Sequence, residues 1–168
     1  DVTSKSGVNK IYKHVKDNYG KLDGLVCNVG SGRGKPPGDE TLDDWNASID
    51  VNFFSALNLI YKFNDLMYED ASIVCISSIC GVKRLSNAPI AYSVSKAALI
   101  RFVSDYATVL SKSGVRINCI SPGNILFEGS TWETKLMEDR QKVYDMIEKK
   151  VPLNMLGEPS DISNLALY

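Results

Sequence analysis

The pattern of apolar and polar residues first predicts a helix. From Val8 to Tyr19, apolar residues recur three or four positions apart, so they share one face of a helix. Thr3 or Ser4 can cap the first turn, and Gly20 is the residue type that most often follows a last turn. We therefore expect the helix to lie between Ser4 and Gly20.

Short apolar runs and longer helical patterns then alternate along the chain. Runs of five or six mostly apolar residues are typical of strands that are buried on both faces. The expected elements are strands at residues 22–27, 72–76 and 115–120, helices at about 41–68 and 91–111, and a last helix from Pro159 to Tyr168.

This alternation predicts the fold class. Strands that are separated by helices pair in parallel, because each crossover connection returns the chain to the same edge of the sheet. We expect an α/β protein with a Rossmann-like, doubly wound parallel sheet between two helix layers, a three-layer α/β/α arrangement. The chain has no repeats and no linker, so residues 1–168 are expected to form one domain.

Composition and charge remove several classes of function. The net charge is −1, and Lys and Arg are spread along the chain, which gives no electrostatic reason to expect nucleic acid or an anionic membrane as partner. No apolar run approaches the roughly 20 residues that a helix needs to cross a bilayer. We expect neither a nucleic-acid nor a membrane partner.

The four cysteines, Cys27, Cys75, Cys80 and Cys119, form no CxxC pair, and His14 is the only histidine. A zinc site needs ligands at short spacings, so no metal site is expected. Three of the cysteines lie in or beside the predicted strands, where a free thiol behaves as a small apolar group. We interpret them as reduced core thiols of a cytoplasmic protein.

The segment at residues 78–96 carries the candidate chemistry. Tyr92 and Lys96 are four residues apart on a predicted helix, so their side chains share a face. An ammonium group near a phenol favours the phenolate and lowers the pKa of the tyrosine toward neutrality, which makes the tyrosine usable as an acid or base. Ser78 ends a predicted strand, where ligands of open α/β sheets bind.

Taken alone, the Tyr92–Lys96 pair is better interpreted as an ordinary exposed pair, because YxxxK occurs by chance in many proteins. Independent features favour a site instead. A strand precedes the pair and ends in two serines, and Gly81 follows Ser78 by three residues. Small residues that allow close helix packing flank the pair: Ser93, Ser95, Ala97 and Ala98.

On these residues the chain resembles the short-chain dehydrogenase/reductase family over essentially its whole length. Ser78, Tyr92 and Lys96 fall on the family's catalytic triad, and DVN at residues 50–52 places Asn52 at its catalytic asparagine. The resemblance implies reversible hydride transfer between NAD or NADP and a small carbonyl or alcohol substrate. Tyr92 would be the acid/base, Ser78 would bind the substrate oxygen, Lys96 would hold the ribose, and Asn52 would anchor a water that relays protons.

Further motifs resemble the family's cofactor-binding elements. Asp1-Val2 resembles the dipeptide that meets the adenine, and CNVG at residues 27–30 keeps two residues of the family's NNAG turn. SPGNI at 121–125 resembles the Pro-Gly turn that contacts the nicotinamide amide, and GEPSDI at 157–162 resembles the element before the last helix. The resemblance implies cofactor contacts at Asp1, Val2, Asn28, Gly30, Tyr92, Lys96, Pro122, Gly123 and Ile125.

The resemblance also implies what surrounds this chain. The family's Gly-rich phosphate-binding turn would precede Asp1 and its last strand would follow Tyr168, so we expect a fragment whose sheet is incomplete at both ends. The residue that chooses between NAD and NADP would lie in the missing part. Family members form homodimers or homotetramers, here through the helices at about 42–68 and 91–111.

Residues 124–151 lie where the family carries its substrate-binding segment. The segment is charged and amphipathic, and we expect two short helices. Phe127 and Trp132 are candidates to cover a ligand, although docking of the segment on the core explains these aromatics equally well. The polarity of the segment favours a hydroxylated substrate, such as a sugar derivative, over a sterol.

Two other functions compete with the oxidoreductase. The loop GSGRGK at 30–35 invites a nucleotide-binding interpretation, but its glycine spacing is too short for a P-loop and Pro36 follows Lys35. A non-catalytic binding or structural subunit of the same family is the stronger alternative. The presence of Asn52, Ser78, Tyr92 and Lys96 together argues against it.

Overall fold

The computed structural model describes residues 1–168, which divide into two compact units, residues 1–121 and residues 122–168. The single domain expected over residues 1–168 stays a prediction. The first unit contains α1 (Lys5–Asn18), β1 (Leu22–Cys27), α2 (Leu42–Ile49), a π-helical turn (Asp50–Phe54), α3 (Ser55–Phe63), β2 (Met67–Ile76), α4 (Ile90–Leu110) and β3 (Arg116–Ile120), with short 3₁₀ turns at Asn64–Leu66, Ile79–Gly81 and Ser111–Ser113. The second contains α5 (Thr131–Glu138), α6 (Arg140–Lys150) and α7 (Pro159–Leu167).

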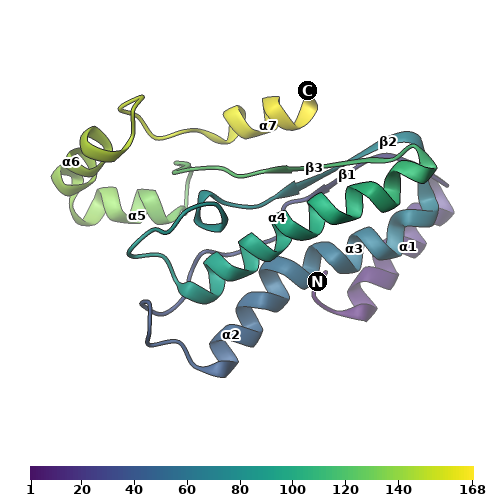
Figure 1. Ribbon diagram of the computed structural model, residues 1–168, viewed down its shortest axis with the longest axis horizontal. Coiled ribbons are helices and arrows are strands. Elements are labelled where there is room, and N and C mark those ends of the chain that lie inside the picture. The colour runs from purple at the N-terminus through teal and green to yellow at the C-terminus, as the bar shows by residue number, and fades with distance from the viewer. The chain divides into compact units, whose positions relative to one another are not determined.

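The sheet of the first unit has three parallel strands in the order β1-β2-β3. In the register, Leu25 lies beside Ile73 and Ile73 beside Ile117, so these three side chains point to the same face. Helices α1, α3 and α4 lie along one side of the strands (Figure 1). The prediction of an α/β fold with a parallel sheet is confirmed.

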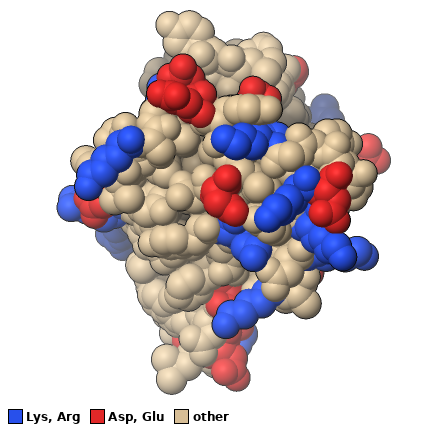
Figure 2. All heavy atoms as spheres, turned by 90° about the vertical axis from the view of Figure 1, so that its right-hand side faces the viewer, with Lys and Arg blue, Asp and Glu red and all other residues tan.

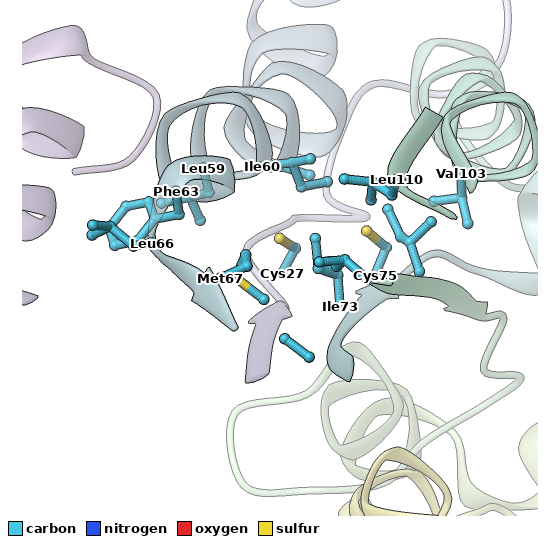
Figure 3. Close-up of a cluster of buried hydrophobic side chains, with 14 of the residues drawn as sticks. Cys27, Leu59, Ile60, Phe63, Leu66, Met67, Ile73, Cys75, Val103 and Leu110 are labelled. Carbon is cyan, nitrogen blue, oxygen red and sulfur yellow. The ribbon is translucent and has the colours of Figure 1, made fainter. Parts of the chain in front are cut away.

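The core lies between this sheet face and the helices. Ile60 and Phe63 of α3, Ile73 and Cys75 of β2, and Leu99 of α4 are at most 2% exposed. Figure 3 shows side chains of α3, β2 and the end of α4 converging above the strands. Burial of this apolar face is what stabilises the arrangement.

A row of thiols crosses the covered face of the sheet. Cys27, Cys75 and Cys119 are paired in register on the three strands, and all four cysteines of the chain are free. A hydrogen bond with Cys27, together with burial, raises the pKa of the Cys75 thiol far above its usual range. Burial raises the pKa of Cys119 to about 11. Cys75 and Cys119 therefore stay protonated at neutral pH and pack as apolar surface.

The first helix has the ends that its sequence predicts. The Ser4 hydroxyl accepts the Gly7 N–H at 3.1 Å, and the helix ends at Asn18. Gly20 has a φ of +77°, a left-handed conformation that glycine adopts without strain, and its N–H donates to the Val15 carbonyl.

The prediction of a helix over residues 41–68 is wrong at the carboxyl end of that range. The helical segment includes a π-helical turn, ends at Phe63 and gives way to β2, which begins at Met67. Leu66 and Met67 are buried and fall at helical spacing from Leu59 and Phe63, so the apolar period continues although the helix does not. Instead, Met67 pairs with Leu22 of β1 and becomes the first residue of β2. The spacing of apolar residues does not encode this pairing.

The second unit is built on short helices with well-defined caps. The Ser130 hydroxyl accepts the Glu133 N–H at the start of α5, and the Asp139 carboxylate accepts the Lys142 N–H at the start of α6. The two short helices expected within residues 124–151 and the last helix beginning at Pro159 are confirmed. Ile125 forms a parallel bridge with Gly157.

Two properties of the whole chain bear on its partners. None of the helices combines the length and the apolar character that crossing a membrane requires. Figure 2 shows Lys and Arg side chains interspersed with Asp and Glu over the face in view. That face therefore presents no patch of a single charge.

Replacing Ile73 by alanine tests the core. Ile73 is fully buried in the middle strand, so Ile73→Ala should lower the free energy of unfolding by about 2–5 kcal/mol through lost transfer energy and the cavity left behind. Urea denaturation of the whole protein measures the change. The control is Leu42→Ala, at a side chain that is 81% exposed, which should stay within about 0.5 kcal/mol of the parent. Equal losses for both variants would contradict the core as described.

Candidate active site

Ser78 lies just beyond the carboxyl end of the middle strand. β2 ends at Ile76, and the Ser77 N–H donates to the Ile120 carbonyl of β3, which keeps the chain on the sheet for one more residue. Ser78 is extended and caps the 3₁₀ turn at Ile79–Gly81, where its hydroxyl accepts the Cys80 N–H at 3.1 Å. Only 7% of Ser78 is exposed, so its hydroxyl is held in a sheltered place.

Tyr92 and Lys96 lie one turn apart in the first two turns of α4, as their spacing predicts. Ser78 lies close enough to the Tyr92 hydroxyl to lower the pKa of Tyr92. Lys96 is 3% exposed, and its Nζ donates to the Ile76 carbonyl at 2.9 Å. The helix therefore brings both side chains to the end of β2.

The electrostatics of the pair differ from the expectation. Burial raises the pKa of Tyr92 above its usual value, a hydrogen bond from Ser78 lowers it, and the nearby Cys80 thiol raises it. Lys96 is not among the groups that shift the pKa of Tyr92, because its ammonium is directed to the Ile76 carbonyl. Burial also lowers the pKa of Lys96. In this structure the partner that favours the phenolate is Ser78.

Asn52 lies in the π-helical turn between α2 and α3 and is 2% exposed. Its Oδ1 accepts the Ser31 N–H at 2.8 Å, and its Nδ2 donates to the carbonyls of Ser31 and Ser48, each at 3.0 Å. π-Helical turns within helices often mark functional sites. Here the Asn52 amide clamps the start of the loop that follows β1, a role that the sequence did not reveal.

That loop passes directly over the site. A Cβ built on Gly30 would lie 2.9 Å from both Asn52 Oδ1 and Lys96 Nζ, so only glycine fits between them. A Cβ built on Gly32 would lie 3.4 Å from Tyr92 Cζ, the ring carbon that bears the hydroxyl. The loop therefore covers Lys96 with one glycine and the phenol with another.

Two residues after β2 hold the second turn of α4 in place. The buried Ser77 hydroxyl donates to the Lys96 carbonyl at 2.9 Å. A Cβ built on Gly81 would lie 2.7 Å from the Lys96 carbonyl carbon, so the helix backbone packs against bare main chain. Sequence reasoning noted Gly81 but missed Ser77, whose only signal was its place beside Ser78.

The structure thus gathers Gly30, Asn52, Ser78, Tyr92 and Lys96 at the carboxyl ends of β1 and β2. The other expected cofactor contacts stay predictions. Asn28 is exposed after β1, Asp1 accepts hydrogen bonds from Thr3 before α1, and the Val2 carbonyl accepts the Asn58 amide at 3.5 Å. Pro122, Gly123 and Ile125 belong to the second unit.

The chemistry of this set fits a hydroxylated ligand. Lys96 carries three N–H donors, and one of them is bonded to the Ile76 carbonyl, which leaves donors for ligand hydroxyls such as those of a ribose. No three His, Cys, Asp or Glu side chains come together as a metal site would need. Arg33 is exposed on the loop, and Lys35 forms an ion pair with Asp44 at 2.8 Å.

Comparisons with known proteins bear on the family of the chain. The family model described as enoyl-(acyl carrier protein) reductase matches residues 1–168. A tropinone reductase homolog of Arabidopsis thaliana is 31% identical, and glucose 1-dehydrogenase 2 of Bacillus subtilis is 30% identical, each over 100% of this chain. The chain spans 62% and 64% of these two relatives' own lengths.

Solved structures agree in fold. The 7α-hydroxysteroid dehydrogenase complexed with NADH and 7-oxo glycochenodeoxycholic acid is 28% identical, with a TM-score of 0.85, over 99% of this chain and 64% of its own. A short-chain dehydrogenase of Leptospira borgpetersenii with bound NAD+ is 25% identical, with a TM-score of 0.84, over the same shares of the two chains. With a matching family model over its full length, a parallel α/β fold and these relatives, the chain belongs to the short-chain dehydrogenase/reductase family.

Proposed function

We propose that the whole protein is an NAD- or NADP-dependent oxidoreductase that interconverts a small carbonyl compound and its alcohol. The observation that carries the proposal is the nearness of Ser78 to the Tyr92 hydroxyl, whose pKa it lowers, one helical turn from the buried Lys96. Two hydroxyls that meet in a sheltered place can both contact one substrate oxygen.

The chain's own residues supply the proton chemistry. The cofactor, when bound, supplies or accepts the hydride. In the reducing direction, the Tyr92 hydroxyl donates its proton to the oxygen that gains negative charge, while the Ser78 hydroxyl hydrogen-bonds the same oxygen. Lys96 binds the ribose hydroxyls through the donors that Ile76 leaves available. Asn52, whose amide holds the covering loop, sits where it can anchor a water that passes protons on from Lys96.

The choice of cofactor follows the family. The two similar solved structures contain NADH and NAD+, respectively, which supports a nicotinamide dinucleotide here. We propose contacts from Asp1, Val2, Asn28 and Gly30, and from the three residues of the Pro-Gly turn, Pro122, Gly123 and Ile125. The free thiols of all four cysteines support a reducing compartment, and we place the protein in the cytoplasm.

A non-catalytic subunit of the family remains the second candidate, and the burial of Lys96 argues against it. A lysine that is 3% exposed, and whose ammonium is bonded to a single carbonyl, lowers the stability of a fold because the charge loses its contact with water. A purely structural helix would be better served by an apolar side chain at this position. Fluorescence titration with NADH and NADPH separates the two candidates, because the second predicts that neither binds.

For the substrate, we propose that residues 124–151 form the binding segment. Phe127 is 53% exposed, and Lys135 Nζ lies 4.5 Å from the centroid of the Trp132 ring, so aromatic and charged groups are displayed together. Such a surface suits a compound with several hydroxyl groups. The similarity to a glucose dehydrogenase supports the same class.

We also propose a homodimer or homotetramer. Aromatic rings from the π-helical turn, α3 and α4 form a chain of contacts with centroids 5.0–6.2 Å apart, and it remains partly exposed, with Tyr61 at 60% and Phe54 at 45%. Exposed apolar surface of this kind typically marks a protein interface.

Removing the Tyr92 hydroxyl tests the reaction. Tyr92→Phe should lower kcat by about 10²–10⁴-fold, because the proton donor is lost while the ring that packs under Gly32 is kept. Steady-state kinetics with NADH or NADPH and a panel of carbonyl compounds measure it, and circular dichroism checks that the variant is folded. Near-normal turnover would refute the assignment.

Ser78→Ala tests the electrostatics. The bond from Ser78 lowers the pKa of Tyr92, so its removal should raise that pKa further. Carbonyl reduction needs the protonated phenol and is lost as pH rises through this pKa, so the alkaline limb of the pH–rate profile should move to higher pH. Turnover should also fall, because one donor to the substrate oxygen is gone. A limb that moves to lower pH would contradict the described contact.

Tyr61→Asp tests the assembly. A carboxylate in the middle of the aromatic contacts should weaken association, which sedimentation velocity would show as a smaller species. The matched control is Tyr19→Asp at the end of α1, where the side chain is 70% exposed and lies outside the aromatic contacts. An unchanged sedimentation coefficient in Tyr61→Asp, or an equal loss in Tyr19→Asp, would contradict the interface.

A further inference from the structure

The helix that carries Tyr92 begins without a cap of its own. Pro89 is its N-cap residue and offers no side-chain acceptor, and its first turn contains no acidic residue. The first hydrogen bond within the helix runs from the Ser93 N–H to the Pro89 carbonyl. The N–H groups of Ile90, Ala91 and Tyr92 therefore need partners from outside the helix.

Glu40 supplies one of these partners from 51 residues earlier in the chain. Its Oε1 accepts the Ala91 N–H at 2.8 Å. A local cap residue would normally accept at this second helical position. Ala91 is 2% exposed, and the negative charge of the carboxylate also stabilises the positive end of the helix dipole.

Glu40 is itself held firmly. It precedes Thr41, which caps α2 in a reciprocal pair of hydrogen bonds with Asp44, and Asp44 in turn pairs with Lys35 of the loop at 2.8 Å. The second carboxylate oxygen of Glu40 accepts the Gly38 N–H at 3.4 Å. The start of α4 is thus tied to the start of α2 by one carboxylate.

The space beside this first turn is partly empty. Glu40, Pro89 and Ala91 line a cavity of about 230 Å³ together with Asn52 and residues of the covering loop. Without the carboxylate, the turn faces open space into which it can shift. The residue after Ala91 is Tyr92, so a shift there moves the phenol away from Ser78 and from under Gly32.

We propose that Glu40 is a positioning residue for the acid/base tyrosine. It touches neither substrate nor cofactor; by accepting the Ala91 N–H it fixes the first turn of α4 and thereby the Tyr92–Ser78 contact. The inference rests on the proposed function for its effect on turnover, although the geometry that it describes does not.

The test compares Glu40→Ala, which removes the acceptor, with Glu40→Gln, which keeps an oxygen acceptor without the charge. In the whole protein, Glu40→Ala should lower kcat by about tenfold or more while the KM for the cofactor changes by less than about threefold, since misplacing a catalytic group penalises the reaction step. Glu40→Gln should recover kcat to within about threefold of the parent. Asp105→Ala is the control, because it removes an exposed carboxylate contact with Arg101 on the same helix.

A second readout needs no turnover. Hydrogen exchange should speed up by about tenfold at the Ala91 amide in Glu40→Ala and return toward the parent rate in Glu40→Gln. NMR of ¹³C-labelled tyrosine, assigned with Tyr92→Phe, should show the pKa of Tyr92 rising in Glu40→Ala, because the Ser78 bond that lowers it is weakened. A general loss of stability would not move this titration.

Several results would overturn the proposal: unchanged kcat and titration in Glu40→Ala, a Glu40→Gln variant as impaired as Glu40→Ala, or an equal loss in Asp105→Ala. If the parent protein turns over no substrate and binds no cofactor, the proposed function fails on its own. The exchange and titration data then still decide whether Glu40 positions Tyr92.

Discussion

The site depends on how closely α4 approaches the end of β2. Gly81 lies against the backbone at Lys96 with no room for a Cβ, and the Ser77 hydroxyl donates to the Lys96 carbonyl. These contacts fix the height of the helix above the sheet. The phenol of Tyr92 then meets Ser78, and the ammonium of Lys96 reaches the last carbonyl of the strand. A bulkier residue at position 81 would separate all of these groups at once.

The groups around the Lys96 ammonium are mostly apolar or neutral, so its pKa depends on few neighbours. Cys75 and Cys119 lie near Lys96 as neutral thiols, and the Ile76 carbonyl is its one hydrogen-bond acceptor. The pKa of a charged group in apolar surroundings shifts strongly when a polar group is placed beside it.

The sequence was enough to predict those features that depend on residues close together in the chain. Strand positions, their parallel pairing and the shared face of Tyr92 and Lys96 follow from apolar period and helical spacing. The partners of each side chain do not. The Ser31 bonds of Asn52, the Ile76 carbonyl on Lys96 and the link from Glu40 to Ala91 join residues 20 or more apart in the chain. The end of α3 was mispredicted for the same reason, because Met67 pairs with Leu22, which is distant in the chain but lies on the neighbouring strand.

The π-helical turn at Asp50–Phe54 has a consequence for the two helices that it joins. A turn with an additional residue rotates everything after it by about 100° relative to an uninterrupted α-helix, since 3.6 residues complete one turn. The side chains of α2 and α3 therefore follow two different helical phases. Those of α2 face the loop and the start of α4, and those of α3 face the core. Loss of a single residue here would merge the two phases, so the seating of α3 in the core depends on the length of this turn.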